Sequence, residues 1–326
     1  MTEGGLSMAL TPRSSPAIPS SVPSYALDYA PLVWLDVEEN YFPSDMAAQL
    51  TNTQPELNYT VITTGPSPLT LDNLNSLNPN DEDVYLTSID DISTNPAWLN
   101  GTVPDGSGQT EGAVSSVIVS VDKGSGEVDV FYFYFYAYNK GDIVLKQELG
   151  DHVGDWEHNM IRFQDGTPQT VWFSQHSFGE AFTYDIVQKQ GQRVIDFSAR
   201  GTHANYAING THDHTIPDLN LDGGLIDDYT SQGTLWDPTL SAYYYSYDNS
   251  TGVFTPYDSS SPVNYLYYLG QWGDDQYPSS DPRQKEFFGF YKYTAGPTGP
   301  IDKKLGRTDV CPPSSDACII RTELGP

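Results

Sequence analysis

Residues 127–138 constrain the fold of this chain more than any other stretch. Phenylalanines occupy positions 131, 133 and 135, and tyrosines occupy positions 132, 134 and 136. In an extended strand this alternation places the phenylalanines on one face and the tyrosines on the other. Both faces are aromatic, which indicates a central strand that is buried on both sides. An apolar stretch at 115–121 and a Gly-containing turn at 123–126 make this strand the second arm of a hairpin.

Other stretches also favour strands over helices. Strand patterns occur at 32–35, 157–163, 170–176 and 193–198. Only short helices are expected, one at 45–50 capped by Ser44 and one that begins near Thr70. The sequence therefore predicts an all-β fold, a two-sheet β-sandwich with long loops and a few short helices. We expect a disordered N-terminal segment at 1–24, a single sandwich domain at 25–295 and an irregular C-terminal strap at 296–326.

Composition limits the partners and the location of the protein. The chain has 326 residues and a net charge of -28, which excludes nucleic acid and disfavours anionic membrane surfaces. No apolar stretch is long enough to span a bilayer. Two cysteines, Cys311 and Cys318, favour a local disulfide over a zinc site, because no further cysteine is present. With four Asn-x-Ser/Thr sequons, this predicts an extracellular (secreted) or vacuolar glycoprotein whose signal has been removed.

The stretch 150–158 carries the clearest chemistry. If a strand begins at Asp155, the carboxylates of Asp155 and Glu157 share one face, with His152 on the entering loop. Like charges on one face repel unless a cation lies between them. We therefore expect a divalent metal ion here, of a kind (Ca, Mg, Mn or Zn) that the sequence does not distinguish. The alternative is a surface strand whose carboxylates pair with Arg162 or Lys140.

Two further histidines are expected at the ends of strands. His176 follows the strand at 170–176, and His203 follows the strand at 193–198. Strand ends are where a scaffold presents ligands from distant parts of the chain, so both become candidate metal ligands. Taken singly, each is more often a core or surface histidine, but together with the stretch 150–158 they favour a shared site. Arg200 is a candidate for binding an anionic substrate group or for pairing with a site carboxylate.

Other motifs indicate less. The segment 218–228 has the spacing of a calcium loop but Tyr229 where the closing glutamate belongs, so a true calcium loop is not expected. The pair His212 and His214 suits either a metal clasp or an exposed position. There is no nucleophile elbow, phosphate-binding glycine loop or dinucleotide fingerprint. Most of the aromatic residues are expected in the core, although some could stack on sugars.

Several motifs together resemble the Vps62-like family of vacuolar protein sorting-associated proteins. They cover most of residues 25–275 and occur in this order: Tyr29-Ala-Pro-Leu-Val-Trp-Leu, Glu39-Asn-Tyr-Phe-Pro-Ser-Asp, Tyr136-Ala-Tyr-Asn-Lys-Gly, His152-Val-Gly-Asp-Trp-Glu-His, Ser174-Gln-His-Ser, Ser198-Ala-Arg-Gly-Thr-His-Ala-Asn-Tyr and Gly224-Leu-Ile-Asp-Asp-Tyr-Thr to Trp236-Asp-Pro. The resemblance implies a link to vacuolar sorting and does not supply a defined reaction.

A more local similarity is to necrosis-inducing secreted proteins, through Asp155-Trp156-Glu157. Those proteins have a β-sandwich fold and bind a divalent cation near a site for sphingolipid heads. The similarity implies metal ligation by His152, Asp155 and Glu157. An upstream acidic ligand would be supplied by Asp142, or its place taken by Asn139. Gly154 stands where their signature has a second histidine.

These observations lead to three hypotheses. The preferred one is a metal-assisted hydrolase of a glycan or phosphoester, with the metal ion among Asp155, Glu157, His176, His203 and Asp142. In it His152, His158 and Arg200 would serve catalysis, the histidines by moving a proton. The second is a non-enzymatic binder of a carbohydrate or glycolipid head that uses the same metal ion. The third is a structural metal site with the function elsewhere. A monomer is expected in each case.

Overall fold

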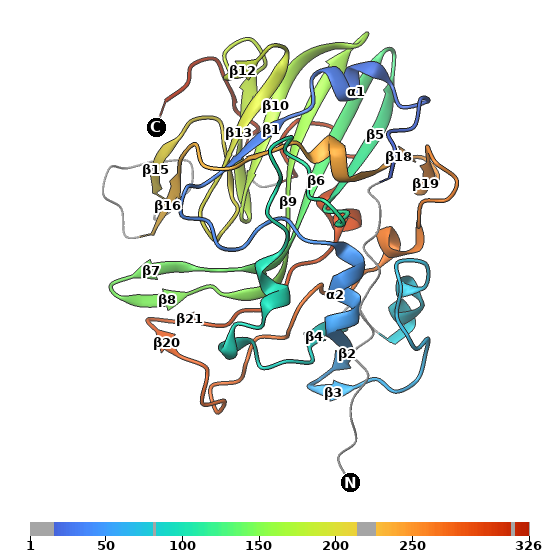
Figure 1. The fold of residues 1–326 in the computed structure, drawn as a ribbon. Helices are drawn as coiled ribbons and strands as arrows, with labels where there is room; N and C mark the ends of the chain where they lie inside the picture. The colour runs from blue at the N-terminus through green and yellow to red at the C-terminus, as the bar shows by residue number, and fades with distance from the viewer. Residues whose placement is uncertain (1–15, 81–82, 214–225, 314–316, 326) are drawn as a thin grey trace.

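The computed structural model describes residues 16–80, 83–213, 226–313 and 317–325. Its centre is an eight-stranded sheet in the order β19-β18-β5-β6-β9-β10-β11-β22 (Figure 1). Neighbouring strands run antiparallel except for the parallel pairs β18–β5 and β11–β22. The strand bounds are β5 Ser116–Gly124, β6 Glu127–Asn139, β9 His152–Gln164, β10 Thr167–Gln175, β11 Phe178–Thr183, β18 Ala242–Asp248, β19 Val253–Pro256 and β22 Ile320–Arg321.

A smaller sheet packs against one face of this large sheet. It has the order β12-β13-β1-β17, and β14 pairs with β13. Tyr132, Tyr134 and Tyr136 of β6 are fully buried between the two sheets, together with Val33 and Trp236 from the small sheet. The result is the two-sheet sandwich that the sequence predicts. The bounds are β1 Leu32–Leu35, β12 Lys189–Gln190, β13 Arg193–Ser198, β14 Asn205–Tyr206 and β17 Leu235–Trp236.

The other face of the large sheet is covered by short helices and loops. Phe131, Phe133 and Phe135 are fully buried there against side chains of the helical segments α2, η1 and η5 and of strand β4. β6 is therefore a central strand buried on both faces, as its aromatic alternation predicts. The bounds of these segments are α2 Met46–Asn52, η1 Leu74–Asn80, η5 Asn264–Tyr267 and β4 Tyr85–Ser88, and β4 pairs with β2 Thr53–Leu57, which also pairs with β3 Thr60–Val61.

The start of α2 corrects one detail of the sequence analysis. The N-cap is Asp45, not Ser44, because the Asp45 carboxylate accepts a hydrogen bond from the backbone N–H of Ala48 at 2.7 Å. Its second oxygen accepts from the backbone N–H of Val114 at 2.9 Å, so the cap also ties the helix to the strand region. None of the helices in the described part of the chain is long and apolar enough to cross a membrane.

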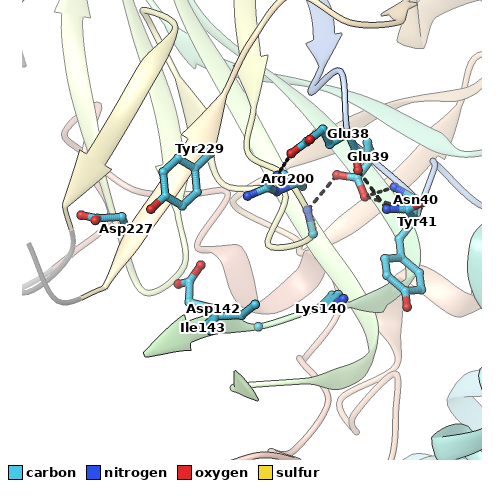
Figure 2. A pocket seen from close by; sticks show the side chains of 12 residues that line it. Glu38, Glu39, Asn40, Tyr41, Lys140, Asp142, Ile143, Arg200, Asp227 and Tyr229 are labelled. Carbon is cyan, nitrogen blue, oxygen red and sulfur yellow. Dashed lines mark hydrogen bonds and ion pairs between the residues drawn. The ribbon is translucent and has the colours of Figure 1, made fainter. Parts of the chain in front are cut away.

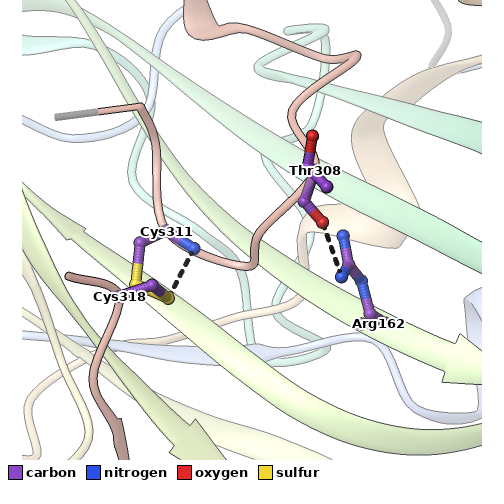
Figure 3. Close-up of a disulfide and its surroundings, with 4 residues drawn as sticks. All are labelled: Arg162, Thr308, Cys311 and Cys318. Atoms are coloured by element: carbon purple, nitrogen blue, oxygen red, sulfur yellow. Dashed lines mark hydrogen bonds between the residues drawn. A yellow bond between two sulfur atoms is a disulfide. The ribbon is translucent and has the colours of Figure 1, made fainter.

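Three hairpins and a C-terminal strap complete the fold; the strap is not wholly irregular as expected, because its strand β22 pairs with β11 at the edge of the large sheet. The hairpins are β7 Asp142–Val144 with β8 Gln147–Leu149, β15 Gly210–Asp213 with β16 Asp227–Thr230, and β20 Glu286–Phe287 with β21 Phe290–Tyr291. The predicted disulfide between Cys311 and Cys318 is present near the end of the strap (Figure 3). Arg162 of β9 donates a hydrogen bond to the Thr308 carbonyl at 2.9 Å, which holds the strap against the large sheet. The remaining helical segments are α1 Ser24–Asp28, η2 Ile92–Thr94, η3 Ala97–Asn100, η4 Pro238–Ser241 and η6 Pro300–Lys303. Residues 16–24 are not disordered as expected, because Val22 is buried in the core and α1 begins at Ser24.

Candidate functional site

Strand β9 presents its two carboxylates on the tyrosine face of the large sheet. Asp155 lies opposite Tyr136 and Glu157 lies opposite Tyr134, and both are only 5% exposed. The shared face agrees with the sequence analysis, but the strand begins at His152 instead of Asp155. Gly154 has a φ of 68°, and a Cβ there would lie 2.3 Å from the Trp272 carbonyl oxygen. Glycine is therefore required for β9 to pass this close to the neighbouring backbone.

His203 is the nearest partner of Asp155. It lies in the turn after β13, and its ring stacks on Tyr136 with centroids 3.7 Å apart. Its Nδ1 contacts the Asp155 carboxylate at 2.9 Å, and its Nε2 contacts the Tyr41 carbonyl oxygen at 2.9 Å. Both partners are acceptors, so both ring nitrogens donate and His203 is an imidazolium. Burial lowers the pKa of His203, but Asp155 and Glu39 outweigh it and raise the pKa.

A second histidine–carboxylate pair lies beside the first. His176, in the turn after β10, places its Nε2 3.3 Å from the Asp228 carboxylate of β16. The same carboxylate accepts hydrogen bonds from Thr202 and from the Tyr206 hydroxyl. Burial lowers the pKa of His176, but Asp228, Glu157 and Asp142 together raise it to about 9. His176 therefore carries a positive charge at neutral pH, close to the acidic side chains of Asp228, Glu157 and Asp142.

Two of these carboxylates hold their protons unusually tightly. Burial and the negative charges of Asp228 and Asp227 raise the pKa of Asp142, on β7, to about 8. Burial and the charge of Asp155 raise the pKa of Glu157 to about 7, although Glu157 accepts a hydrogen bond from the Ser174 hydroxyl. The region therefore has more carboxylates than its histidine cations can neutralise, which is the condition that favours binding of a cation.

His152 differs from the two charged histidines. Burial lowers its pKa, and Asp155 offsets this only in part. Its Nδ1 lies 2.7 Å from the Gly154 carbonyl oxygen, which can only accept. Nδ1 therefore carries the proton, and Nε2 is left with a lone pair. A backbone carbonyl that fixes the tautomer in this way is characteristic of histidines that bind metals.

The expectation for His158 needs correction. It lies on the phenylalanine face, where its ring packs 5.5 Å from that of Phe133 and 6.1 Å from that of Phe131. Burial lowers its pKa well below the usual value, so it is a neutral core side chain on the side of the sheet opposite Asp155 and Glu157. The alternation of β9 explains this placement, because residue 158 points to the opposite face of the strand from residues 155 and 157.

A polar pocket with a cavity volume of about 690 Å³ opens beside these pairs. It lies between the loop after β1, the hairpin β7–β8 and the turn after β13 (Figure 2). Arg200 lies in it, paired with Glu38 and with its guanidinium 5.2 Å from the centre of the Tyr229 ring. Glu39 closes one side by accepting hydrogen bonds from the backbone N–H groups of Tyr41 and Gly201, each at 2.8 Å. Asp142, Lys140 and Asp227 also line the pocket.

The structure thus gathers most of the candidate metal ligands but does not preform a metal site. Among the residues that the structure describes, no three or more His, Cys, Asp or Glu side chains are arranged to hold a metal ion. Asp155 and His203 contact each other, and His176 contacts Asp228. Asn139 donates to the Gly150 carbonyl at 3.0 Å, so Asp142 is the upstream acidic group that interacts with the cluster. His214 and most of the segment 218–228 lie outside the described residues, while His212 is buried and stacks on Tyr206.

Several residues of the cluster were not identified as site residues from the sequence. In the sequence, Asp228 stands within a segment that fails as a calcium loop, and Glu39 and Tyr41 stand within a family motif. Asp228 faces Thr202 and Tyr206, which lie in the segment that also carries His203. That segment could have indicated these partners from the sequence, because polar side chains that are buried need hydrogen-bond partners.

Comparisons with solved structures show only distant similarity. A necrosis- and ethylene-inducing protein 2 from the causal agent of cocoa's witches' broom disease covers 65% of this chain and 76% of its own, at 13% identity and a TM-score of 0.29. The non-toxic protein HaNLP3 covers 72% and 80%, at 12% identity and a TM-score of 0.32. Sequence identities and TM-scores this low give no evidence about the function of the chain.

Sequence relatives are much closer. The Saccharomyces cerevisiae protein TDA6, named for vacuolar protein sorting, is 39% identical over 90% of this chain and 69% of its own length. Vacuolar protein sorting-associated protein 62 of the same yeast is 36% identical over 89% of this chain and 68% of its own. The model of the family "Vacuolar protein sorting-associated protein 62" matches residues 14–275. The chain therefore belongs to the Vps62 family.

Proposed function

We propose that this protein acts in vacuolar sorting as a divalent-cation-dependent binder of a glycan or glycolipid head. The observation that carries the proposal is the state of His152, a neutral histidine whose Nδ1 is fixed by the Gly154 carbonyl and whose electrostatic neighbours are Asp155, His176 and His203. The names of the two yeast relatives favour the vacuolar pathway over secretion from the cell.

The donor set suits a hard cation in its chemistry. His152, Asp155, Glu157 and Asp142 offer one imidazole nitrogen and three carboxylates, which fits Ca²⁺, Mg²⁺, Mn²⁺ or Zn²⁺. Protons on Asp142, Glu157 and His176 supply the positive charge in the structure described here. A bound cation would replace these protons, so binding should release protons to the solvent. When bound, the cation would supply coordination positions for hydroxyl oxygens of a ligand.

The adjoining pocket suits a polar, hydroxyl-rich ligand. Tyr229 and Tyr41 offer aromatic surfaces, and Arg200, Glu38 and Lys140 offer charged groups that can hydrogen-bond to hydroxyls. A sugar uses both kinds of contact, stacking through its C–H face and hydrogen bonding through its edge. The pocket volume of about 690 Å³ is sufficient for one or two sugar rings.

Isothermal titration calorimetry tests the cation site. Each candidate metal is titrated into protein freed of metal, at pH 7 in two buffers of different ionisation enthalpy. The apparent enthalpy should differ between the buffers, because protons leave the protein. Glu157→Gln and His152→Ala should each abolish uptake. Asp274→Asn should not, although Asp274 is also a buried carboxylate whose pKa is raised, by burial, to about 6.

Two outcomes would count against the proposal. The first is that none of the four metals binds to the unmodified protein. The second is that both site variants retain full metal occupancy by elemental analysis. Sugar binding is then assessed on a glycan array with and without EDTA, where the expected signal requires the cation and is lost in Arg200→Ala.

A metal-assisted hydrolase is the second candidate, and Asp142 favours it. A carboxyl group with a pKa of about 8 holds a proton at neutral pH and lines the pocket, as a general acid must. A screen of glycans and phosphoesters distinguishes the candidates. The hydrolase predicts turnover that Asp142→Asn removes while ligand binding persists, whereas the binder predicts no turnover with any substrate.

A further inference from the structure

Two hairpins extend from the same end of the molecule and lie next to each other. They are β7–β8 and β20–β21, seen together at the lower left of Figure 1. The backbone N–H of Gly150, just after β8, donates to the Tyr291 carbonyl of β21 at 2.9 Å. The N–H of Asp151 donates to the Lys292 carbonyl at 2.7 Å. These bonds fix the bases of the two hairpins relative to each other, and both hairpins extend to the same side of the molecule in Figure 1.

That surface carries large apolar side chains in solvent. Ile143, Leu145, Phe288 and Phe290, which we call the hairpin face, are 69%, 64%, 84% and 57% exposed. Leu145 and Phe288 also occupy turn positions with φ values of 49° and 51°. Such positions favour Gly, Asn or Asp, and a bulky side chain there costs the fold about 1 kcal/mol. The fold leaves most of the surface of each of these side chains exposed, which favours a contact with something outside the chain.

The charge of this region differs from that of the rest of the protein. Residues 140–151 and 281–292, which comprise both hairpins and their flanks, carry five basic and five acidic side chains, against a net charge of -28 for the whole chain. Lys146 adjoins Leu145 at one turn, and Lys285 precedes β20 in the other hairpin, both exposed. Lysine beside an exposed apolar side chain allows the apolar group to enter an oily layer while the ammonium group remains at its polar surface.

We propose that the hairpin face docks on a phospholipid bilayer. Leu145 and Phe288 stand at the turns of two narrow hairpins, with Ile143 and Phe290 on the adjoining strands, and such hairpins can enter between lipid headgroups without a complementary groove. Phenylalanine and leucine would supply the apolar contact, and Lys146 and Lys285 would face the lipid phosphates. Ile143 also lines the polar pocket (Figure 2), so the pocket would open close to the headgroup layer.

Flotation with lipid vesicles tests this proposal. The intact protein is mixed with phosphatidylcholine vesicles, in EDTA, and bound protein is measured after centrifugation. EDTA makes the result independent of the proposed cation site. Binding is expected, and Phe288→Ser and Leu145→Ser should each weaken the partition coefficient about tenfold. A matched control is Val253→Ser in β19, which removes an exposed apolar side chain, 47% exposed, on the opposite side of the molecule in Figure 1.

The outcomes separate clearly. Vesicle binding that both hairpin variants lose and Val253→Ser keeps supports docking, provided that the variants have unchanged circular dichroism spectra. No flotation of the unmodified protein, with or without added anionic lipid, overturns it. Equal binding by all variants also overturns it. If the protein instead self-associates by light scattering and Phe288→Ser abolishes that association, a second copy of the chain is the partner and the bilayer proposal fails.

Discussion

The buried carboxyl group of Glu157 should make the stability of this protein depend on pH. Burial and the charge of Asp155 raise its pKa from 4.5 to about 7 in the folded state. The folded state therefore holds a proton between pH 4.5 and 7 that the unfolded chain releases. Stability contributed in this way is fully present below pH 4.5, falls as the pH rises to 7 and is constant above it.

The size of the effect follows from the shift. A change of about 2.5 pKa units corresponds to about 3 kcal/mol of unfolding free energy between pH 4.5 and 8. Urea unfolding of metal-free protein, followed by tryptophan fluorescence at both pH values, measures this difference. Glu157→Gln removes the titrating group and keeps the shape, so the variant should lose about 3 kcal/mol of the pH dependence. Asp274→Asn should lose less of the pH dependence, because the pKa of Asp274, which is raised mainly by burial, is only about 6.

The reasoning is refuted if Glu157→Gln retains the pH dependence of the unmodified protein. A saturating divalent cation provides a further check. If the proposed site includes Glu157, the cation stabilises the ionised form, and the loss of stability between pH 4.5 and 7 should shrink. A cation that stabilises Glu157→Gln as strongly as the unmodified protein would place its binding site elsewhere.

Three other predictions concern the fold and its modification. Gly154→Ala should lower stability by about 3 kcal/mol in urea unfolding, because the new Cβ would lie 2.3 Å from the Trp272 carbonyl oxygen and φ is positive; an unchanged midpoint would show that β9 adapts. Replacing Cys311 and Cys318 by serine should lower the free energy of unfolding by about 2–3 kcal/mol, measured by thermal unfolding, because the disulfide restricts the unfolded chain but closes only a short loop; equal melting temperatures with and without reductant would contradict this. Treatment with an N-glycosidase should reduce the mass of protein from a eukaryotic host, since the sequon asparagines are exposed, and an unchanged mass would show that these sites are not used: Asn58, Asn100, Asn209 and Asn249.

Local alternation made much of the fold predictable. The aromatic residues of β6 specify two buried faces, and the structure has a sheet on one face and helices with loops on the other. Helix ends were less predictable, because Ser44 and Asp45 are adjacent and both can cap. Asp45 is the cap because its second oxygen also binds the backbone of Val114, a contact that depends on tertiary structure.

The candidate site was predictable only in part, for a reason that Asp155 and His203 illustrate. The alternation of β9 shows that Asp155 and Glu157 share a face, but it does not show what stands opposite. The structure places His203, 48 residues away, against Asp155, and gives both of its nitrogens an acceptor. A histidine that donates twice is a counter-ion and not a ready ligand. Motif spacing cannot separate these roles, because the protonation state depends on partners such as the Tyr41 carbonyl, which no motif records.

The histidines of this cluster have different roles. His203 is bound on both sides and neutralises Asp155 within the folded chain, while His152 keeps a lone pair on Nε2. His176 is charged like His203, but its partner is Asp228, the residue between the pocket-lining Asp227 and Tyr229. A cation that enters from the pocket would compete with the proton of His176 before that of His203. His176→Gln should therefore raise cation affinity at pH 7, where His203→Gln should mainly destabilise the fold, by about 3–5 kcal/mol for a broken buried pair. Calorimetry and urea unfolding of the two variants measure this, and equal effects in both assays would show that the two histidines share one role.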